Sequence, residues 1–239
     1  MNAGKEGKSI LDLGCGLGQD LRQLCVESGA VAKLYATDAD QKVWDLGLEM
    51  FGDGEKPVAK FFCADARKQN FGGKLDEIIG TVDVVITSQL LDLFWFHGQL
   101  EVLENVVRLS KVGTKVMDCT LGTADGEVLE YESDGYGPFS RFYHSRYSLE
   151  IPWIDVAART NTKWRVEAAH AGSGSPQALL RSAQPIDVSH QKSSTFNEGL
   201  ERTPLHLAKG SEICHLCTLV LGKIIPPLAR THKGILHGE

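Results

Sequence analysis

The residues of this chain with the clearest capacity for chemistry form one glycine-rich turn that begins with an acid. Asp12 is followed by glycines at alternate positions, Gly14, Gly16 and Gly18. Glycine adopts backbone conformations that a Cβ forbids, and it lets a ligand lie directly against the main chain. A short apolar run precedes the turn and a helical pattern follows it, so the amides of the helix N-terminus point toward the same place. This arrangement predicts a nucleotide-type site at the first turn of a doubly wound sheet.

The spacing of the glycines indicates which nucleotide the turn binds. A dinucleotide fingerprint has the pattern G-x-G-x-x-G, whereas this chain has G-x-G-x-G after an acid. The Asp12 carboxylate would repel a pyrophosphate and attract an ammonium group. We therefore expect a ligand with an amino-acid end and a nucleoside end, such as S-adenosylmethionine, and we disfavour a nicotinamide-dependent reductase. A glycine-rich turn without any ligand is the structural alternative.

Two further acids follow predicted strands. A carboxylate at the position of Asp38 can accept hydrogen bonds from both hydroxyls of a ribose, with Asp40 as the alternative ligand. Asp38 could instead cap the helix predicted over residues 40–51, and both roles are compatible. Asp65 follows the strand predicted over residues 59–64 and is the third acid at the end of a predicted strand.

An alternation of strand and helix patterns positions these acids. It predicts an α/β fold with a Rossmann-like, doubly wound and mostly parallel sheet. Strands are expected around residues 10–13 and over 33–38, 59–64, 82–87, 114–121 and 163–168, and helices over 40–51, 99–110 and around 149–160. Ser88 opens the loop after the central strand, at the edge of the sheet where open α/β folds bind ligands.

Composition bounds the class of protein. The 239 residues are 42% hydrophobic and 23% charged, and the net charge is −6 without a basic run, so we expect no nucleic-acid partner. The polar start lacks the apolar segment of a signal peptide, and we expect no membrane association because no run reaches the roughly 18–20 apolar residues of a membrane span. Six cysteines without a disulfide pattern are expected to be reduced core thiols in a cytoplasmic protein.

The end of the chain shows little organisation. We expect residues 1–182 to form the cofactor-binding domain and residues 183–239 to form a poorly organised extension, with 177–182 as a remnant of a seventh strand. Cys214 and Cys217 form a lone C-x-x-C without a second pair, so we predict no metal or redox site there.

The acid-and-glycine turn resembles the first motif of class I S-adenosylmethionine-dependent methyltransferases. Further segments resemble the small fungal methyltransferases of meroterpenoid and related secondary-metabolite clusters, several of which methylate a carboxylic acid. These segments are Gly18-Gln-Asp20-Leu-Arg22, Leu34-Tyr-Ala-Thr-Asp38, Asp45-Leu-Gly47 and Thr160-Asn-Thr-Lys-Trp-Arg-Val-Glu-Ala168. The similarity covers about residues 8 to 170. It implies S-adenosylmethionine as cofactor, a small hydrophobic acid or hydroxyl compound as substrate, and a homodimer.

The resemblance also implies the cofactor contacts. In the family, the positions of Asp65 and Ala66 lie beside the adenine and its exocyclic amine. The whole predicted cofactor-binding set is Asp12, Gly14, Gly16, Gly18, Asp38, Ala39, Asp65, Ala66 and Ser88. No metal is expected.

The chain departs from the family pattern in three ways. Asp92 stands where the family usually carries a histidine, and the tryptophan usually found a little further on is displaced, with Trp95 in that region. The family also has a helical segment ahead of the first motif that closes over the active site. This chain begins a few residues before its first predicted strand, so we expect that the lid is missing or that the sequence is short at its start.

The acceptor decides whether catalysis needs a base. A carboxylate is already ionised at neutral pH, whereas a phenol or enol needs a general base, for which His97 and His144 are candidates. Asp92 in the pocket would repel an acid and would favour a hydroxyl substrate. The other class of function is a catalytically impaired, methyltransferase-like protein that binds the cofactor or a partner.

The aromatic segment 122–148 has two interpretations. It could wall a hydrophobic substrate pocket in which Arg141, His144 or Arg146 holds a carboxylate. Its aromatic side chains could equally pack the loop against the sheet.

Overall fold

The computed structural model describes residues 7–28, 33–123, 126–133, 137–145, 147–171 and 214–223, and for 127–133, 137–141, 168–171 and 214–223 it describes the backbone. The strands are β1 (Ser9–Leu13), β2 (Lys33–Asp38), β3 (Lys60–Cys63), β4 (Val82–Ile86), β5 (Ser110–Gly122), β6 (Glu127–Ser133), β7 (Gly137–Tyr143), β8 (Lys163–Ala171) and β9 (Cys214–Lys223). The α-helices are α1 (Gln19–Ser28), α2 (Gln41–Phe51), α3 (Phe96–Leu109) and α4 (Ile151–Thr160). Short 3-10 helices are η2 (Gln69–Gly73), η3 (Asp76–Ile78), η4 (Leu91–Leu93) and η5 (Ser148–Glu150).

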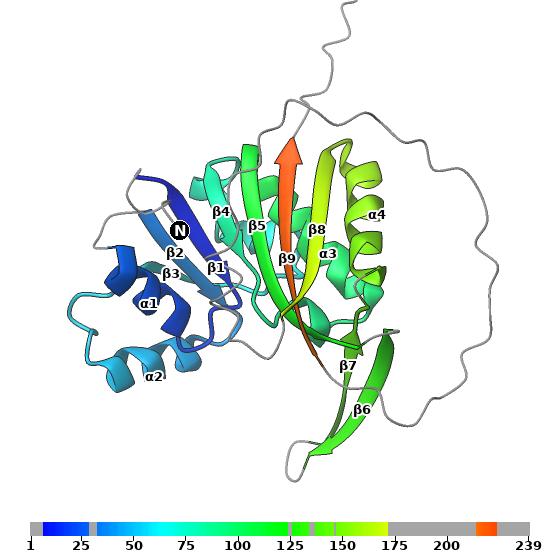
Figure 1. The fold of residues 1–239 in the computed structure, drawn as a ribbon. Helices are drawn as coiled ribbons and strands as arrows, with labels where there is room; N and C mark the ends of the chain where they lie inside the picture. Colours follow the sequence, from blue (N-terminus) through cyan, green and yellow to red (C-terminus); the bar gives the residue numbers. More distant parts are fainter. Residues whose placement is uncertain are drawn as a thin grey trace, which may run out of the picture.

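Seven strands form one sheet in the order β3-β2-β1-β4-β5-β9-β8 (Figure 1). The first five of these strands pair in parallel, while β9 runs antiparallel to both of its neighbours. The predicted doubly wound, mostly parallel sheet is therefore confirmed.

Helices cover both faces of the parallel part of the sheet. The residues of β1 show why both faces are apolar. Leu11 and Leu13 pack into a cluster with residues of α3 and α4, whereas Ile10 packs into a cluster that includes Leu24 of α1. Successive strand residues point to opposite faces, so a continuous apolar run supplies both layers. Figure 1 shows α3 and α4 together behind β5 and β8, and α1 and α2 beside the other half of the sheet.

The seventh strand differs from the expectation. Residues 177–182 lie outside the described residues, and the strand between β5 and β8 is β9. Residues 214–223, which fall within the predicted extension 183–239, belong to the same sheet as β1. They form β9, which pairs along its length with two strands that come much earlier in the chain.

The aromatic segment 122–148 contains a two-stranded antiparallel hairpin, β6–β7, that extends from the end of the main sheet (Figure 1). Among its described side chains, Tyr143 is buried, as packing against the sheet predicts, whereas Tyr147 is 81% exposed. The side chain of Arg141 and all of Arg146 lie outside the described residues.

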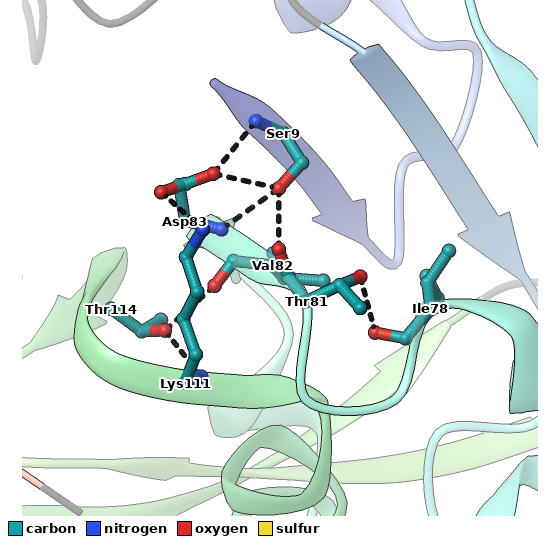
Figure 2. Close-up of polar contacts among 7 residues, drawn as sticks. All are labelled: Ser9, Ile78, Thr81, Val82, Asp83, Lys111 and Thr114. Carbon is teal, nitrogen blue, oxygen red and sulfur yellow. Dashed lines mark hydrogen bonds and ion pairs between the residues drawn. The ribbon is translucent and has the colours of Figure 1, made fainter.

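A polar cluster ties the strands together at the amino ends of β1, β4 and β5 (Figure 2). The Asp83 carboxylate accepts hydrogen bonds from the amide and hydroxyl of Ser9 and pairs with Lys111 at 2.7 Å. The hydroxyl of Thr114 donates to the carbonyl of Val82. Partial burial raises the pKa of Asp83, but Lys111 and Ser9 outweigh it and hold that pKa below its ordinary value. This edge of the sheet is thus occupied by structural contacts.

Within the described ranges, no helix combines the length and apolar character that crossing a membrane requires.

Candidate functional site

Four predicted cofactor residues lie at one edge of the sheet. Asp12 is the last residue but one of β1, Asp38 ends β2, Asp65 follows β3 and Ser88 follows β4. These four strands are adjacent and parallel, so their carboxyl ends meet along one edge. That edge is where open α/β sheets bind ligands.

The glycine turn has the left-handed backbone conformations that the sequence predicts. Gly14, Gly16 and Gly18 have φ values of 79°, 53° and 74°, in the left-handed region that favours glycine. The amides of Gly14 and Cys15 both donate to the carbonyl of Thr37 on β2, which fixes the turn against the neighbouring strand. No atom lies within 4 Å of where a Cβ of Gly16 would stand, so a ligand has room against its backbone.

The Asp38 carboxylate links the turn to the end of β2. It accepts hydrogen bonds from the amide of Gly16 at 3.0 Å and from the amide of Asp40 at 3.1 Å. A carboxylate can accept about four hydrogen bonds, which leaves capacity for ribose hydroxyls. Asp40 has a different function, because its side chain accepts from the amide of Lys42 and caps α2. Ala39, between them, is exposed.

Asp12 lies beneath the turn and is only 3% exposed. Burial, together with the negative charges of Asp20 and Asp38, raises the pKa of Asp12 to about 7. A cation beside this carboxylate would favour its ionised form. The site is therefore suited to a ligand that brings positive charge.

Asp65 and Ala66, in the loop after β3, are each held by a neighbouring side chain. Partial burial raises the pKa of Asp65, but the amide and guanidinium of Arg67 outweigh it and keep that pKa below its ordinary value. The guanidinium also lies 5.2 Å from the ring centre of Phe94. The carbonyl of Ala66 accepts from the Asn105 side chain at 2.8 Å, which anchors this loop to α3.

The segment after β4 contains Ser88 and Asp92. Ser88 is half-buried, and the next residue, Gln89, has a φ of 52° and donates its amide to the carbonyl of Cys119 on β5. Asp92 lies in η4 with no exposed surface. It is enclosed by the fold and does not line an open pocket.

The two candidate histidines differ in environment. His97 is on the first turn of α3 with a 79% exposed side chain, and its Nε2 lies 3.5 Å from Glu101. His144 is buried, and its Nε2 and Nδ1 lie 2.9 Å from Gln99 Oε1 and 3.2 Å from Ser148 Oγ. Because the Gln99 amide nitrogen donates to the Phe94 carbonyl, its oxygen faces the imidazole, and Nε2 carries the proton. Burial lowers the pKa of His144 to about 4, although Ser148 opposes the shift.

A supporting cluster behind the glycine turn was not predicted. The Arg22 guanidinium makes two 2.8 Å hydrogen bonds to Asp53 and lies over the rings of Trp44 and Phe51. The carbonyl of Leu17 in the turn accepts a further hydrogen bond from Arg22. Arg22 could have been identified from the sequence, because it lies in one of the segments that resemble the fungal methyltransferases.

These residues fit S-adenosylmethionine. The open backbone at Gly16, the carboxylate of Asp38 and the buried acid Asp12 lie next to one another along one edge of the sheet. They offer room against the backbone, acceptors for ribose hydroxyls, and a negative group for an ammonium or sulfonium.

Comparison with known proteins supports the same class. Residues 10–113 match the family described as a methyltransferase domain, which confirms the predicted cofactor, S-adenosylmethionine. The O-methyltransferase phiE of a fungal isolate is 32% identical over 160 residues, 66% of this chain and 52% of the relative. The methyltransferase ausD of Penicillium brasilianum is 31% identical over 167 residues, 69% of this chain and 58% of the relative. The chain thus spans about half the length of the curated relatives it matches.

Solved structures share the fold at low sequence identity. A SAM-dependent methyltransferase from Methanosarcina mazei has a TM-score of 0.56 at 12% identity, covering 92% of this chain and 94% of that one. The phosphoethanolamine N-methyltransferase 2 of Haemonchus contortus has a TM-score of 0.52 at 14% identity, covering 92% and 49%. Residues 10–113 therefore match a methyltransferase domain, the chain has the fold of class I S-adenosylmethionine-dependent methyltransferases, and it resembles fungal O-methyltransferases of secondary metabolism.

Proposed function

We propose that this chain methylates a carboxylate oxygen of a small hydrophobic metabolite, using S-adenosylmethionine. The observation that carries the proposal is the placement of the three candidate bases. His97 points to solvent beside Glu101, His144 is buried between Gln99 and Ser148, and Asp92 has no exposed surface. A carboxylate is the acceptor that needs none of them, because it is ionised at neutral pH.

The residues of the site would bind and orient the reactants. When bound, S-adenosylmethionine supplies an electrophilic methyl group on a positively charged sulfur. The Asp38 carboxylate would hold the ribose of the nucleoside end against the open backbone of Gly16, while Asp12 would balance the charge of the amino-acid end. Alignment of the two reactants then supplies most of the rate enhancement, because no proton has to be transferred.

Exposed apolar side chains support a hydrophobic substrate. Leu93 and Trp95, which follow the loop after β4, are 46% and 58% exposed. Water-accessible apolar groups close to a ligand-binding edge are typical of a pocket for an apolar molecule. The resemblance to meroterpenoid methyltransferases agrees with such a substrate.

Calorimetric titration with S-adenosylhomocysteine tests the cofactor site. We expect micromolar binding by the wild-type chain, and Asp38→Ala should weaken it by at least about tenfold because a charged hydrogen-bond acceptor is lost. The matched control is Asp40→Ala, which removes the cap of α2 and should cost about 1 kcal/mol of stability while binding is retained. A folded wild-type chain that does not bind would refute the proposal.

Transfer of a labelled methyl group to a panel of aromatic and terpenoid acids, each with a matched phenol or alcohol, tests the acceptor. We expect product from acids only, and alkali should release the label because esters hydrolyse and ethers do not. Alkali-stable product from the phenols would contradict a carboxylate acceptor. Binding without transfer to any acceptor would support the catalytically impaired alternative.

A further inference from the structure

Two cysteines from distant parts of the chain lie opposite each other in the sheet. Strands β5 and β9 pair antiparallel, and their register places Cys119 directly across from Cys217. The other neighbour of Cys217 is Ala169 on β8. The pair therefore joins the parallel part of the sheet to the strand supplied by the end of the chain.

The hydrogen bonds of β5 show which kind of cross-strand pair this is. The carbonyl of Cys119 accepts from the amide of Gln89 at 2.8 Å, and the carbonyl of Met117 accepts from the amide of Thr87 at 2.9 Å. Both donors lie just beyond β4, so these β5 residues direct their backbone polar groups away from β9. Cys119 and Cys217 consequently form a non-hydrogen-bonded pair.

A non-hydrogen-bonded pair has the spacing that a disulfide requires. Its Cα atoms are about 4.5 Å apart, and disulfides span Cα separations of about 4.4–6.8 Å. Opposed residues of a pair stand on the same face of the sheet. Cys119 is half-buried, so a small oxidant can reach it.

The other cysteines with a known place in the sheet do not have this arrangement. Cys63 is exposed, contrary to the expectation of a core thiol, and lies opposite Asp38 on β2. Cys214 lies opposite Gly122. Cys214 and Cys217 are three positions apart in one strand and fall on opposite faces, which disfavours the C-x-x-C as a chelating or redox pair of its own.

We propose that Cys119 and Cys217 are a modification site that forms a reversible cross-strand disulfide with a disulfide oxidant such as oxidised glutathione. One cysteine thiolate attacks a sulfur of oxidised glutathione and releases one glutathione thiolate. The second cysteine thiolate attacks the resulting mixed disulfide and releases the other. Two protein thiols are oxidised to one disulfide, one glutathione disulfide is reduced to two thiols, and the two cysteine protons pass to the released thiolates.

The bond would fasten β9 to β5 and close a long loop of the chain. Closing a long loop restricts the unfolded chain, so the oxidised protein should unfold at a higher temperature. The proposal does not depend on methyl transfer, because neither the pairing nor the test involves cofactor.

The test is a peptide map of the full chain after reduction, equilibration with oxidised glutathione, and alkylation. We expect a peptide linked through Cys119 and Cys217, an intact mass lower by two hydrogen atoms, and a Tm raised by at least about 5 °C that dithiothreitol reverses. Cys119→Ser and Cys217→Ser should each abolish the link and the Tm shift. Cys63→Ser is the matched control and should keep both.

Three results would overturn the proposal. Cys119 could be recovered fully alkylated, it could carry glutathione as a stable mixed disulfide, or it could be linked to a cysteine other than Cys217. If a serine variant does not fold, the peptide map of the wild-type chain still gives one of these answers.

Discussion

At the scale of single residues, two buried groups make opposite contributions to the pH dependence of stability. The pKa of Asp12 is raised from 3.8 to about 7, so the folded state keeps a proton that the unfolded state loses, and stability falls as the pH rises from about 4 to about 7. The pKa of His144 is lowered from 6.5 to about 4, so stability falls as the pH drops through that window. The two slopes offset each other in the wild-type chain.

Removing one of these groups should expose the slope of the other. In Asp12→Asn, the free energy of unfolding should rise with pH between about 4 and 6.5, by up to about 1.4 kcal/mol per pH unit, because the contribution of His144 is then no longer offset by that of Asp12. In His144→Phe it should fall over the same range. Urea unfolding at half-unit pH steps measures both. Profiles parallel to that of the wild-type chain in both variants would show that these groups do not control the slope.

Asp12 should also couple cofactor binding to proton release. If the proposed cofactor binds, its positive charges favour the ionised carboxylate, so binding near pH 7 should release a fraction of a proton per site. Titrations with S-adenosylmethionine in buffers of different ionisation enthalpy measure that fraction. Asp12→Asn should bind without the release, and a binding enthalpy that does not vary with buffer in the wild-type chain would contradict this role.

At the scale of elements, Gly47 is what allows α2 to approach the glycine turn. A Cβ at Gly47 would overlap the carbonyl of Leu17, which also accepts a hydrogen bond from Arg22. Gly47→Ala should therefore push α2 away from the turn, destabilise the fold by about 2 kcal/mol or more, and weaken S-adenosylhomocysteine binding.

Gly54→Ala is the matched control for that substitution. The nearest atom to a Cβ at Gly54 is Leu48 Cβ at 4.0 Å, which is an ordinary contact. Urea unfolding and calorimetry should show little change for Gly54→Ala. Equal effects of the two variants would mean that the loss reflects helix composition or loop entropy, with no specific contact between α2 and the turn.

The elements that could be predicted from sequence are those whose pattern is local. Strands β1 to β4 are short apolar runs that end near acids, so the positions of Asp12, Asp38 and Asp65 along one edge followed from the order of strands and helices. The environments of the candidate bases could not be predicted, because they depend on partners from other elements. The burial of Gln99, the partner of His144, could have been predicted, because Gln99 lies on the apolar face of α3 with Leu103 and Val106.

The hairpin β6–β7 could have been predicted from its turn sequence. Asp134-Gly135 lies between two short segments that contain β-branched and aromatic residues, and Asp-Gly is a strong hairpin signal. The aromatic content of the segment instead suggested a loop. The lesson is that turn chemistry predicts local pairing better than composition does.

At the scale of the whole molecule, β9 is the element that could not be placed from the sequence. It follows β8 only after a long interval of the chain, and its partners β5 and β8 are both antiparallel to it. Its apolar run from Leu216 to Leu221 is too short to distinguish a central strand from other buried segments. Only the assembled sheet shows the gap that β9 fills.

Truncation tests whether β9 is part of the folding unit. A chain ending at residue 182, the predicted domain boundary, lacks β9 and leaves β8 without the only strand that pairs with it in the described sheet. Losing two ladders should exceed the roughly 5–15 kcal/mol by which domains are stable, so this chain should show no cooperative urea transition. A chain ending at residue 223 keeps β9 and should unfold like the full chain. If the chain ending at 182 unfolds cooperatively at the full-length midpoint, β9 is dispensable and the boundary at 182 is real.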